Sequence, residues 1–461
     1  MNLLSAGAAQ TVTGSCHLLD LNGLKILVDC GLFQGPRRIE ALNLEPFPFN
    51  VGDLDVVLLT HGHLDHIGRL PLLIKQGYDG PIYAIRSTQK IAEVILLDSA
   101  KIQREDYLRR MRKAERAGRE SEVEEPLYTD EEVTRTLARF KTVEFDRPLK
   151  LDKGVTATFC PAGHILGSGF IEFDCPDGRI ICSGDLGNRE SSIQADAHPP
   201  RECDAVLVET TYGNRTHRPL SATLEEFSQV ITDSLKSGGK VMIPSFSLER
   251  TQAILYNINN LQRSGDIPQM PVFLDSPMAS KMTRFYMECA NEFIDEVKQD
   301  LAAGNDPFEP QSLKYTVTTD ESKAINDYKG QAIIVAGSGM MTGGRILHHL
   351  KHNLWKKDAS LVVVGYQAEG TLGRRLINGA KEVRIFGDEI RVRASTHTIG
   401  GFSAHADQDD LLEWVGHTGN AKIYMVHGET DVMSEFERVL NDHNRDAIQV
   451  ERARPYELAQ S

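Results

Sequence analysis

The chain has 461 residues, of which 41% are hydrophobic and 25% are charged. These values are typical of globular proteins; they exclude a disordered, collagenous or coiled-coil chain, and the length allows two or three domains. Because 65 acidic residues outnumber 51 basic ones, the net charge is −14, which excludes nucleic-acid binding through bulk charge and leaves only a local site for a polyanion.

Short β-branched runs in the first two hundred residues predict strands that end at polar residues. The runs cover 24–28, 56–60, 156–160, 170–173, 179–182 and 205–208. Polar residues such as Asp29, His61 and Glu209 follow or close these runs. Layered sheets place their chemistry at the carboxyl ends of strands, so we expect a functional site there.

Residues 101–140 differ from their surroundings, because they carry many charges of both signs and have no apolar strand pattern. They predict an exposed helical insertion with a turn near Gly118 and a second helix from Thr129. The RRMRK run in this segment has the charge to contact a polyanion, although no other feature of the sequence supports that role.

From about residue 221, strands alternate with helices, which is typical of a parallel α/β unit. Thr223 and Glu226 have the spacing of a capping box at a helix start. Strands are predicted at 240–243, 332–336 and 361–364, and a helix at 248–263. From about residue 391, strands followed by histidines return, so we interpret the α/β segment as a domain inserted within the first.

The sharpest pattern is His61-Gly62-His63-Leu64-Asp65-His66, between a predicted strand and a predicted helix. Neutral imidazoles and a carboxylate are ligands that suit Zn²⁺. His61 and His63 alternate and can bind one ion, whereas Asp65 and His66 project differently and can bind a second. Two ions need further ligands, and two candidates follow later strands: His164 and Asp185.

This order of motifs resembles the metallo-β-lactamase superfamily. The resemblance implies an α/β fold, an αββα sandwich with two Zn²⁺ ions at its rim. It also implies that His61, His63 and His164 bind one ion, that Asp65 and His66 bind the other, and that Asp185 bridges them. Asp29 corresponds to the first motif of the family, as a carboxylate that orients a ligand.

The middle of the chain resembles the β-CASP domain of nucleic-acid-processing nucleases. The matching segments are ETTYG from Glu209, IPSF from Ile243, GSGMMTGG from Gly337, VGYQAEGTL from Val364, FSAHAD from Phe402 and VHGE from Val426. We expect a metallo-β-lactamase domain at 1–209 and 395–461, interrupted by a parallel α/β β-CASP domain at 210–394. The likeness is to the endonuclease subunit of the cleavage-and-polyadenylation machinery and its short prokaryotic relatives.

Three signature positions carry over from that resemblance: Glu209, His405 and His427. The last is typically Val in DNA-directed members, so His427 indicates RNA; it would complete the ligands of the second ion. The resemblance implies a zinc-dependent ribonuclease in which the ions generate a hydroxide that attacks the phosphodiester. Asp65, Glu209 and His405 are the expected catalytic residues, with His405 as general acid.

The expected reaction cuts single-stranded RNA internally, and at the 5′ end if exonuclease activity is also present, leaving 5′-phosphate and 3′-hydroxyl ends. Ser245, Arg250 and Ser338 are candidate substrate contacts, although Arg250 could equally form a structural ion pair. Two alternatives stay open: a small-molecule hydrolase of the glyoxalase or lactonase kind, and a non-catalytic RNA-processing subunit.

Cysteine spacing and hydropathy indicate the location and the partners. Seven cysteines stand singly and no apolar run approaches the ~20 residues of a membrane span, so we expect reduced thiols in a cytoplasmic protein without a membrane partner. RNA is the expected partner. The sequence is compatible with a homodimer but does not establish an oligomeric state.

Overall fold

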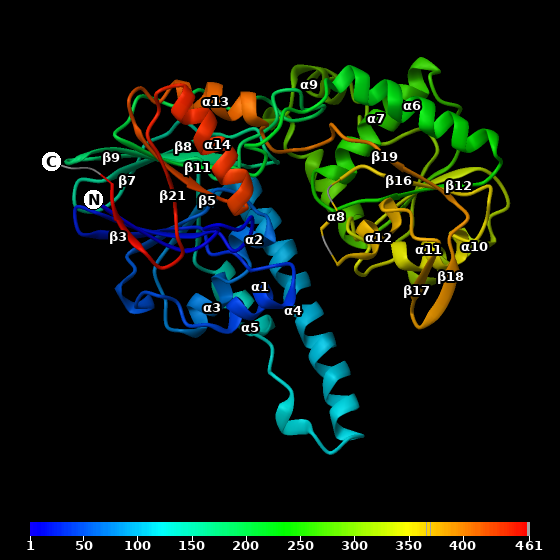
Figure 1. Cartoon of the computed structure of the whole chain (residues 1–461), viewed down its shortest axis with the longest axis horizontal. Helices are drawn as coiled ribbons and strands as arrows, with labels where there is room; N and C mark the ends of the chain where they lie inside the picture. The colour runs from blue at the N-terminus through cyan, green and yellow to red at the C-terminus, as the bar shows by residue number, and fades with distance from the viewer. Residues whose placement is uncertain (366, 369, 459–461) are drawn as a thin grey trace. The chain divides into compact units, whose positions relative to one another are not determined.

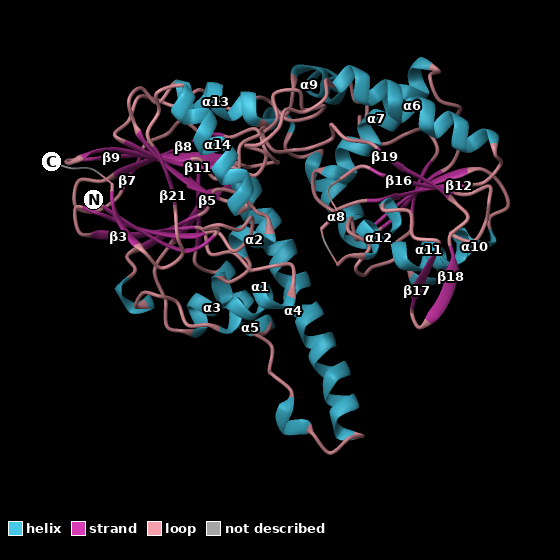
Figure 2. Cartoon of the chain, viewed as in Figure 1, coloured by secondary structure: helices cyan, strands magenta, loops and turns pink. Residues whose placement is uncertain are grey.

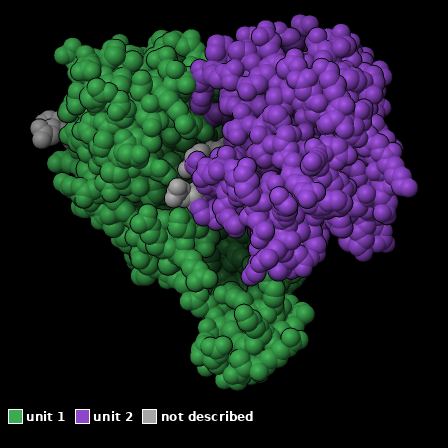
Figure 3. Space-filling model, turned by 45° about the vertical axis from the view of Figure 1, so that its right-hand side comes forward, with its two compact units in different colours: residues 1–189, 196–216, 405–461 green, residues 190–195, 217–404 purple. Residues whose placement is uncertain are grey.

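The computed structural model describes residues 1–365, 367–368 and 370–458. The chain divides into two compact units, coloured separately in Figure 3. Unit 1 comprises 1–189, 196–216 and 405–461, and unit 2 comprises 190–195 and 217–404. The predicted insertion, 210–394, stays a prediction about domain limits.

Unit 1 contains two seven-stranded sheets (Figures 1 and 2). The first has the order β22 (Pro455–Glu457), β1 (Asn2–Gly7), β2 (Cys16–Leu21), β3 (Leu24–Val28), β4 (Val56–Leu58), β5 (Ile82–Ile85) and β6 (Phe140–Val143). The second has the order β21 (Ala447–Gln449), β20 (Lys422–Val426), β11 (Ala205–Glu209), β10 (Gly178–Cys182), β9 (Gly169–Cys175), β8 (Thr156–Pro161) and β7 (Leu149–Lys150).

Helices cover the outer face of each sheet. On the first sheet they are α2 (Leu64–Ile67), α3 (Leu70–Lys75), α4 (Arg86–Glu115) and α5 (Asp130–Leu137). The short helix α1 (Arg37–Glu40) has no buried residue, and 3₁₀ turns lie at Ala41–Leu44, Val51–Asp53 and Glu120–Glu122. On the second they are α13 (Gln408–Gly416) and α14 (Thr430–Asp442). The predicted αββα sandwich is thus confirmed.

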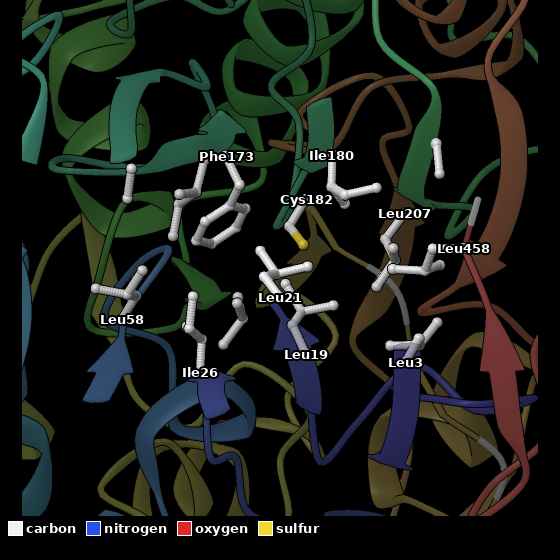
Figure 4. Packing of buried hydrophobic residues seen from close by; sticks show 14 of the residues in the cluster. Leu3, Leu19, Leu21, Ile26, Leu58, Phe173, Ile180, Cys182, Leu207 and Leu458 are labelled. Carbon is white, nitrogen blue, oxygen red and sulfur yellow. The ribbon is translucent and has the colours of Figure 1, made fainter. Parts of the chain in front are cut away.

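Alternation along the strands builds the core of this sandwich. Ile26 and Leu58 point between the sheets, whereas Leu27 and Val57 point outward to the helices. Figure 4 shows side chains of one sheet, such as Ile26, facing those of the other, such as Phe173. The buried layer fixes the register of the strands, because a one-residue slip would turn each apolar set to the wrong face.

Unit 2 is a parallel sheet in the order β14 (Leu313–Tyr315), β13 (Val272–Asp275), β15 (Ala332–Ala336), β12 (Lys240–Pro244), β16 (Ser360–Val363) and β19 (Ser395–Thr398). Its helices are α6 (Leu220–Lys236), α7 (Arg250–Ser264), α8 (Pro277–Tyr286), α9 (Asp295–Ala302), α10 (Thr319–Asp327), α11 (Ile346–Asn353) and α12 (Leu372–Ile377), with a 3₁₀ turn at Ala290–Glu292. A hairpin of β17 (Glu382–Ile385) and β18 (Asp388–Arg391) precedes β19. The parallel α/β unit is confirmed.

The capping box predicted at Thr223 is wrong. Helix α6 begins at Leu220 after Pro219, so Thr223 lies inside the helix and its hydroxyl donates to the Pro219 and Gly400 carbonyl oxygens. Pro219 has no backbone N–H and a restricted φ, so it suits the position just ahead of a first helical turn. In the described part of the chain, no helix combines the length and apolarity needed to cross a membrane.

Candidate metal centre

The site of unit 1 is built from the carboxyl ends of neighbouring parallel strands. Asp185 follows β10, Glu209 closes β11 and His427 follows β20, and these three strands are adjacent and parallel in the second sheet. In the first sheet, Asp29 follows β3, and the histidine-rich loop follows the parallel neighbour β4. Topology therefore brings together side chains that lie far apart in the sequence.

The first group of converging side chains is His61, His63, His164 and Asp185, each with one potential ligand atom, all within 4.8 Å of one another. His63 Nδ1 lies 3.1 Å from His61 Nε2 and 3.3 Å from His164 Nε2. Asp185 Oδ2 lies 3.6 Å from His61 Nε2. Three ring nitrogens and one carboxylate oxygen suit a tetrahedral zinc ion.

The second group is Asp65, His66 and His427, with ligand atoms again within 4.8 Å. His427 Nε2 lies 3.7 Å from Asp65 Oδ2, and His66 Nε2 lies 3.3 Å from Asp185 Oδ1. Asp185 thus faces the first group through one oxygen and the second through the other. The structure brings together all seven residues that the sequence predicts as ligands.

Buried polar atoms in these groups fit bound cations. Within the described residues, Asp185 Oδ1 and His427 Nε2 are buried without a hydrogen-bond partner. Burial of an unsatisfied polar atom is costly, and a cation between the groups would satisfy both atoms. The residues present therefore fit a two-metal site.

The charge states of the ligands also suit metal binding. Burial lowers the pKa of His61 well below its ordinary value and lowers the pKa of His63 to about 4, so both rings are neutral near neutral pH. Burial opposes ionisation of Asp185, yet the neighbouring imidazoles keep its pKa well below its ordinary value. Neutral imidazoles and ionised carboxylates are the forms that bind metals.

Asp29 orients two ligands without being one. Its carboxylate accepts hydrogen bonds from Thr60 N at 2.8 Å, from Thr60 Oγ1 at 2.7 Å and from His66 Nδ1 at 2.8 Å. Thr60 Oγ1 also lies 3.1 Å from His61 Nδ1. Because this hydroxyl donates to Asp29, it accepts from His61 Nδ1–H, which leaves His61 Nε2 free to bind a metal.

Sequence reasoning missed Thr60 and Thr211 as orienting residues. Thr211 Oγ1 donates to the His427 carbonyl oxygen at 3.2 Å and lies 3.0 Å from His427 Nδ1. It therefore accepts from Nδ1–H and leaves the buried Nε2 as the ligand atom. Thr60 lies directly before the histidine-rich loop and Thr211 within ETTYG, but hydroxyls in such places have many other uses.

His66 behaves differently from the neutral ligands. Although burial lowers its pKa, the Asp185 and Asp29 carboxylates together hold the pKa well above its ordinary value. A metal ion therefore has to displace a proton from this ring, and metal binding weakens as pH falls.

His405 and Glu209 form a pair beside the two groups. His405 Nδ1 lies 3.2 Å from each Glu209 carboxylate oxygen and 3.9 Å from Asp185 Oδ2. Burial lowers the pKa of His405, but Glu209 outweighs it and raises the pKa to about 9. Glu209 is buried and also accepts from Leu186 N at 2.6 Å, so it is fixed in position.

Two glycines allow the loops to approach this closely. A Cβ at Gly31 would lie 1.5 Å from the Asp65 carbonyl oxygen. Gly184 has a φ of +54°, and a Cβ there would lie 2.6 Å from Thr60 Cβ. Any larger residue would push Asp65 or Asp185 away from its group.

The expected substrate contacts lie in unit 2. Ser245 is buried and accepts a hydrogen bond from Thr251, and Arg250 donates to the Val364 carbonyl oxygen at 2.6 Å and lies 3.6 Å from Glu249. Ser338 is partly exposed, and its hydroxyl accepts from Thr342 N and Gly343 N. Their role as contacts stays a prediction. Two residues of VGYQAEGTL, Tyr366 and Glu369, lie outside the described residues.

Comparison with known families agrees with this geometry. Residues 10–225 match the metallo-β-lactamase superfamily, residues 251–376 match the Beta-Casp domain, and residues 389–450 match the Zn-dependent metallo-hydrolase RNA specificity domain. A solved structure of a protein of unknown function from Enterococcus faecalis V583 superimposes with a TM-score of 0.57 over 99% of both chains at 12% identity, a likeness of fold alone.

Curated relatives match nearly the whole chain. Ribonuclease TTHA0252 from Thermus thermophilus is 41% identical over 95% of this chain and 96% of its own length. Transcription termination factor FttA is 29% identical in Methanocaldococcus jannaschii and 31% identical in Thermococcus kodakarensis, over 93% of this chain and 67% of each relative. The chain therefore belongs to the β-CASP family of the metallo-β-lactamase superfamily.

Proposed function

We propose that the chain is a zinc-dependent ribonuclease that cuts single-stranded RNA and leaves 5′-phosphate and 3′-hydroxyl ends. Membership of the β-CASP family makes it a metal-dependent hydrolase that acts on RNA. The observation that carries the proposal is the pair of ligand groups sharing Asp185, with His405 and Glu209 beside them.

His61, His63 and His164 would hold one zinc ion, Asp65, His66 and His427 the other, and Asp185 would bridge them. Bound there, two zinc ions would lower the pKa of a water molecule and offset the charge of the scissile phosphate. Asp29, Thr60 and Thr211 hold the ligand rings in the tautomers that binding requires. These residues prepare the site before substrate arrives.

His405 would act as general acid. Hydrolysis joins a hydroxyl oxygen to phosphorus and breaks the bond from phosphorus to the 3′ oxygen, which leaves as an alkoxide unless it is protonated. Glu209 accepts from Nδ1 of His405, so the opposite ring nitrogen, Nε2, is the one that can give its proton to the leaving oxygen. The phosphate therefore remains at the 5′ end of the downstream fragment, and the upstream fragment ends in a 3′-hydroxyl.

The test is cleavage of end-labelled single-stranded RNA by the purified chain, with and without a chelator, and after zinc is restored. We expect internal cuts that the chelator abolishes and zinc restores, with about two zinc ions per chain by elemental analysis. Product mapping separates internal cuts from trimming at the 5′ end. A metal-loaded chain that leaves RNA intact would overturn the proposal.

The same assay separates the two alternatives. Hydrolysis of a lactone or thioester without cleavage of RNA would indicate a small-molecule hydrolase. Binding of RNA without hydrolysis of any of these substrates would indicate a non-catalytic subunit. The proposed site of action is the cytoplasm, in keeping with cysteines that form no disulfide within the described residues. The homodimer considered above stays a prediction, which sedimentation velocity tests.

A further inference from the structure

Helix α4 has two halves with different environments. Seven of its residues are buried, and all lie between Ser87 and Ala100. The second half and the segment that returns to α5 extend away from the sheets of unit 1 (Figure 1), and we call residues 101–126 the arm. The second half adds no buried residue, so the core does not explain its length.

The base of the arm is clamped to the rest of unit 1. Ser99 Oγ lies 2.9 Å from the buried Tyr128 hydroxyl, and Leu127 N donates to Gln103 Oε1 at 3.0 Å. Arg104 forms an ion pair with Asp130. These contacts join the helix of the arm to its returning segment at the base, which makes the arm a fixed projection of unit 1.

The outer part of the arm is basic, in contrast to the chain as a whole. Residues 109–119 contain six cations and one carboxylate, whereas the chain has a net charge of −14. At 100° per residue, the cations at 109, 110, 112, 113 and 116 fall within about 160° of one helical face. The half-buried Tyr107, Met111 and Ala114 lie on the opposite side.

Most of these cations have no acidic partner. Arg109 pairs with Asp106 and Arg119 with Glu122. Across the described residues, no carboxylate comes within ion-pair distance of Arg110, Arg112, Lys113 or Arg116. The other carboxylates of the arm tip lie on the returning segment. A row of exposed cations without acidic partners on one side of a helix creates a positive potential that attracts a polyanion.

We propose that this basic face binds the phosphate backbone of RNA that extends beyond the metal centre. The first half of α4 packs under that centre, because Ile91 lies against Gly62 and Thr88 donates to the Gly167 carbonyl oxygen at 2.6 Å. From Thr88 to Arg112 the helix rises about 36 Å, so only a long RNA reaches both places. The proposal rests on RNA being the substrate.

The test compares two matched triple variants of the full chain. The arm variant is Arg112→Gln, Lys113→Gln and Arg116→Gln, and Gln preserves helix propensity. The control variant is Arg135→Gln, Arg147→Gln and Lys150→Gln, which removes the same charges from exposed positions elsewhere in unit 1. Each is assayed with single-stranded RNA of about 5 nucleotides, the size of one binding site, and of about 30.

We expect the KM of the arm variant for the long RNA to rise about tenfold, while its kcat and its KM for the short RNA stay at the wild-type values. The salt dependence of log affinity should fall by about two, at about 0.7 per lost phosphate contact. The control variant should match the wild type. Unchanged affinity of the arm variant for the long RNA would overturn the proposal; this is the result expected if the basic face binds an acidic protein instead. An equal loss of affinity for the short RNA, or an equal loss in the control variant, would also overturn it.

The arm and the ribonuclease proposals fail differently. If the wild type cuts no RNA, fluorescence anisotropy of the same labelled RNA still measures binding. Weaker binding of long RNA by the arm variant would then support the arm without nuclease activity. Cleavage with equal RNA affinities in all three proteins would support the ribonuclease proposal and overturn the proposal that the arm binds RNA. A wild type that binds no RNA would overturn the arm proposal as well.

Discussion

At the scale of single residues, the geometry of the metal centre depends both on the ligands and on the side chains that hydrogen-bond to them. Asp29, Thr60 and Thr211 fix which ring nitrogen of His66, His61 and His427 carries a proton. Such partners of metal ligands usually contribute 10–100-fold to metal affinity. The ligands can be predicted from the sequence because they belong to one short histidine-rich motif or follow predicted strands. The hydrogen bond between Thr211 and His427 depends on strand pairing that no local pattern encodes.

Thr211→Val should weaken metal binding at the Asp65, His66 and His427 group by 10–100-fold, because His427 loses the partner that fixes its tautomer. Competition titration with a chelator of known affinity measures this. Thr211→Ser keeps the hydroxyl and serves as the control, so it should bind metal like the wild type. Equal weakening in both variants would mean that Thr211 acts through packing.

His405→Ala should slow RNA cleavage by about 10²–10⁴-fold, the usual contribution of a general acid, while zinc content stays near normal. The defect should shrink for a substrate with a leaving group that needs no proton. Glu209→Gln should cause a milder loss of the same kind, because Glu209 orients and charges His405. Single-turnover kinetics and elemental analysis on the same samples measure both quantities.

The exposed His443→Ala is the matched control and should cleave at the wild-type rate. Loss of one zinc ion in His405→Ala would make His405 a ligand. Cleavage at the wild-type rate would remove it from the mechanism.

At the scale of elements, strands were easier to predict than helix limits. Apolar runs predict strands at 24–28 and 332–336, and both coincide with β3 and β15, because a buried strand has a continuous apolar pattern. Helix α6 begins three residues before the predicted cap, because Pro219 lies just ahead of its first turn. Thr223 lies inside the helix, and its hydroxyl donates to the Gly400 carbonyl oxygen far along the chain. The start of α4 was also missed, because its first half is buried on the core and its second half is polar.

Asp275 connects several elements of unit 2. Its buried carboxylate closes β13 and accepts from Ser322 of α10 at 2.6 Å; His349 of α11 lies 2.6 Å away and Arg345 2.7 Å. Asp275→Asn should lower the free energy of unfolding by about 3–5 kcal/mol, because the remaining partners stay buried. Denaturant unfolding measures this, and Asp320→Asn, whose side chain is 95% exposed, is the control.

The same carboxylate predicts a pH dependence. Burial raises the pKa of Asp275, but His349 and the other donors outweigh it and lower the pKa to about 2 from 3.8. This contribution is therefore complete above pH 3.8 and is lost as pH falls toward 2. Over that range the Asp275→Asn variant should lose less stability than the wild type. Parallel curves for the two proteins would contradict the assignment.

At the scale of the whole molecule, the proposed metal ligands are confined to one unit, whereas both units have a hydrophobic core. All seven proposed metal ligands lie in unit 1, and each unit has its own apolar clusters. A ligand that binds only the native state stabilises the part of the structure that holds it. Metal binding should therefore stabilise unit 1 in particular. The sequence predicts that the ligands and the inserted segment belong to different domains, but the packing of separate apolar clusters in each unit is a property of the structure.

Removing the metal with a chelator should raise hydrogen exchange in unit 1 and leave the central strands of unit 2 protected. Without cations, Asp185 Oδ1 and His427 Nε2 stay buried and unsatisfied, so the loops after β4, β10 and β20 should open first. Exchange measured by mass spectrometry resolves these loops from β12 and β15 of unit 2. Restoring zinc should return protection to the loops, whereas magnesium should not, because imidazole-rich sites favour zinc. An equal loss of protection in β12 and β15 would mean that the metal stabilises both units, and no change in the loops would mean that these residues hold no metal.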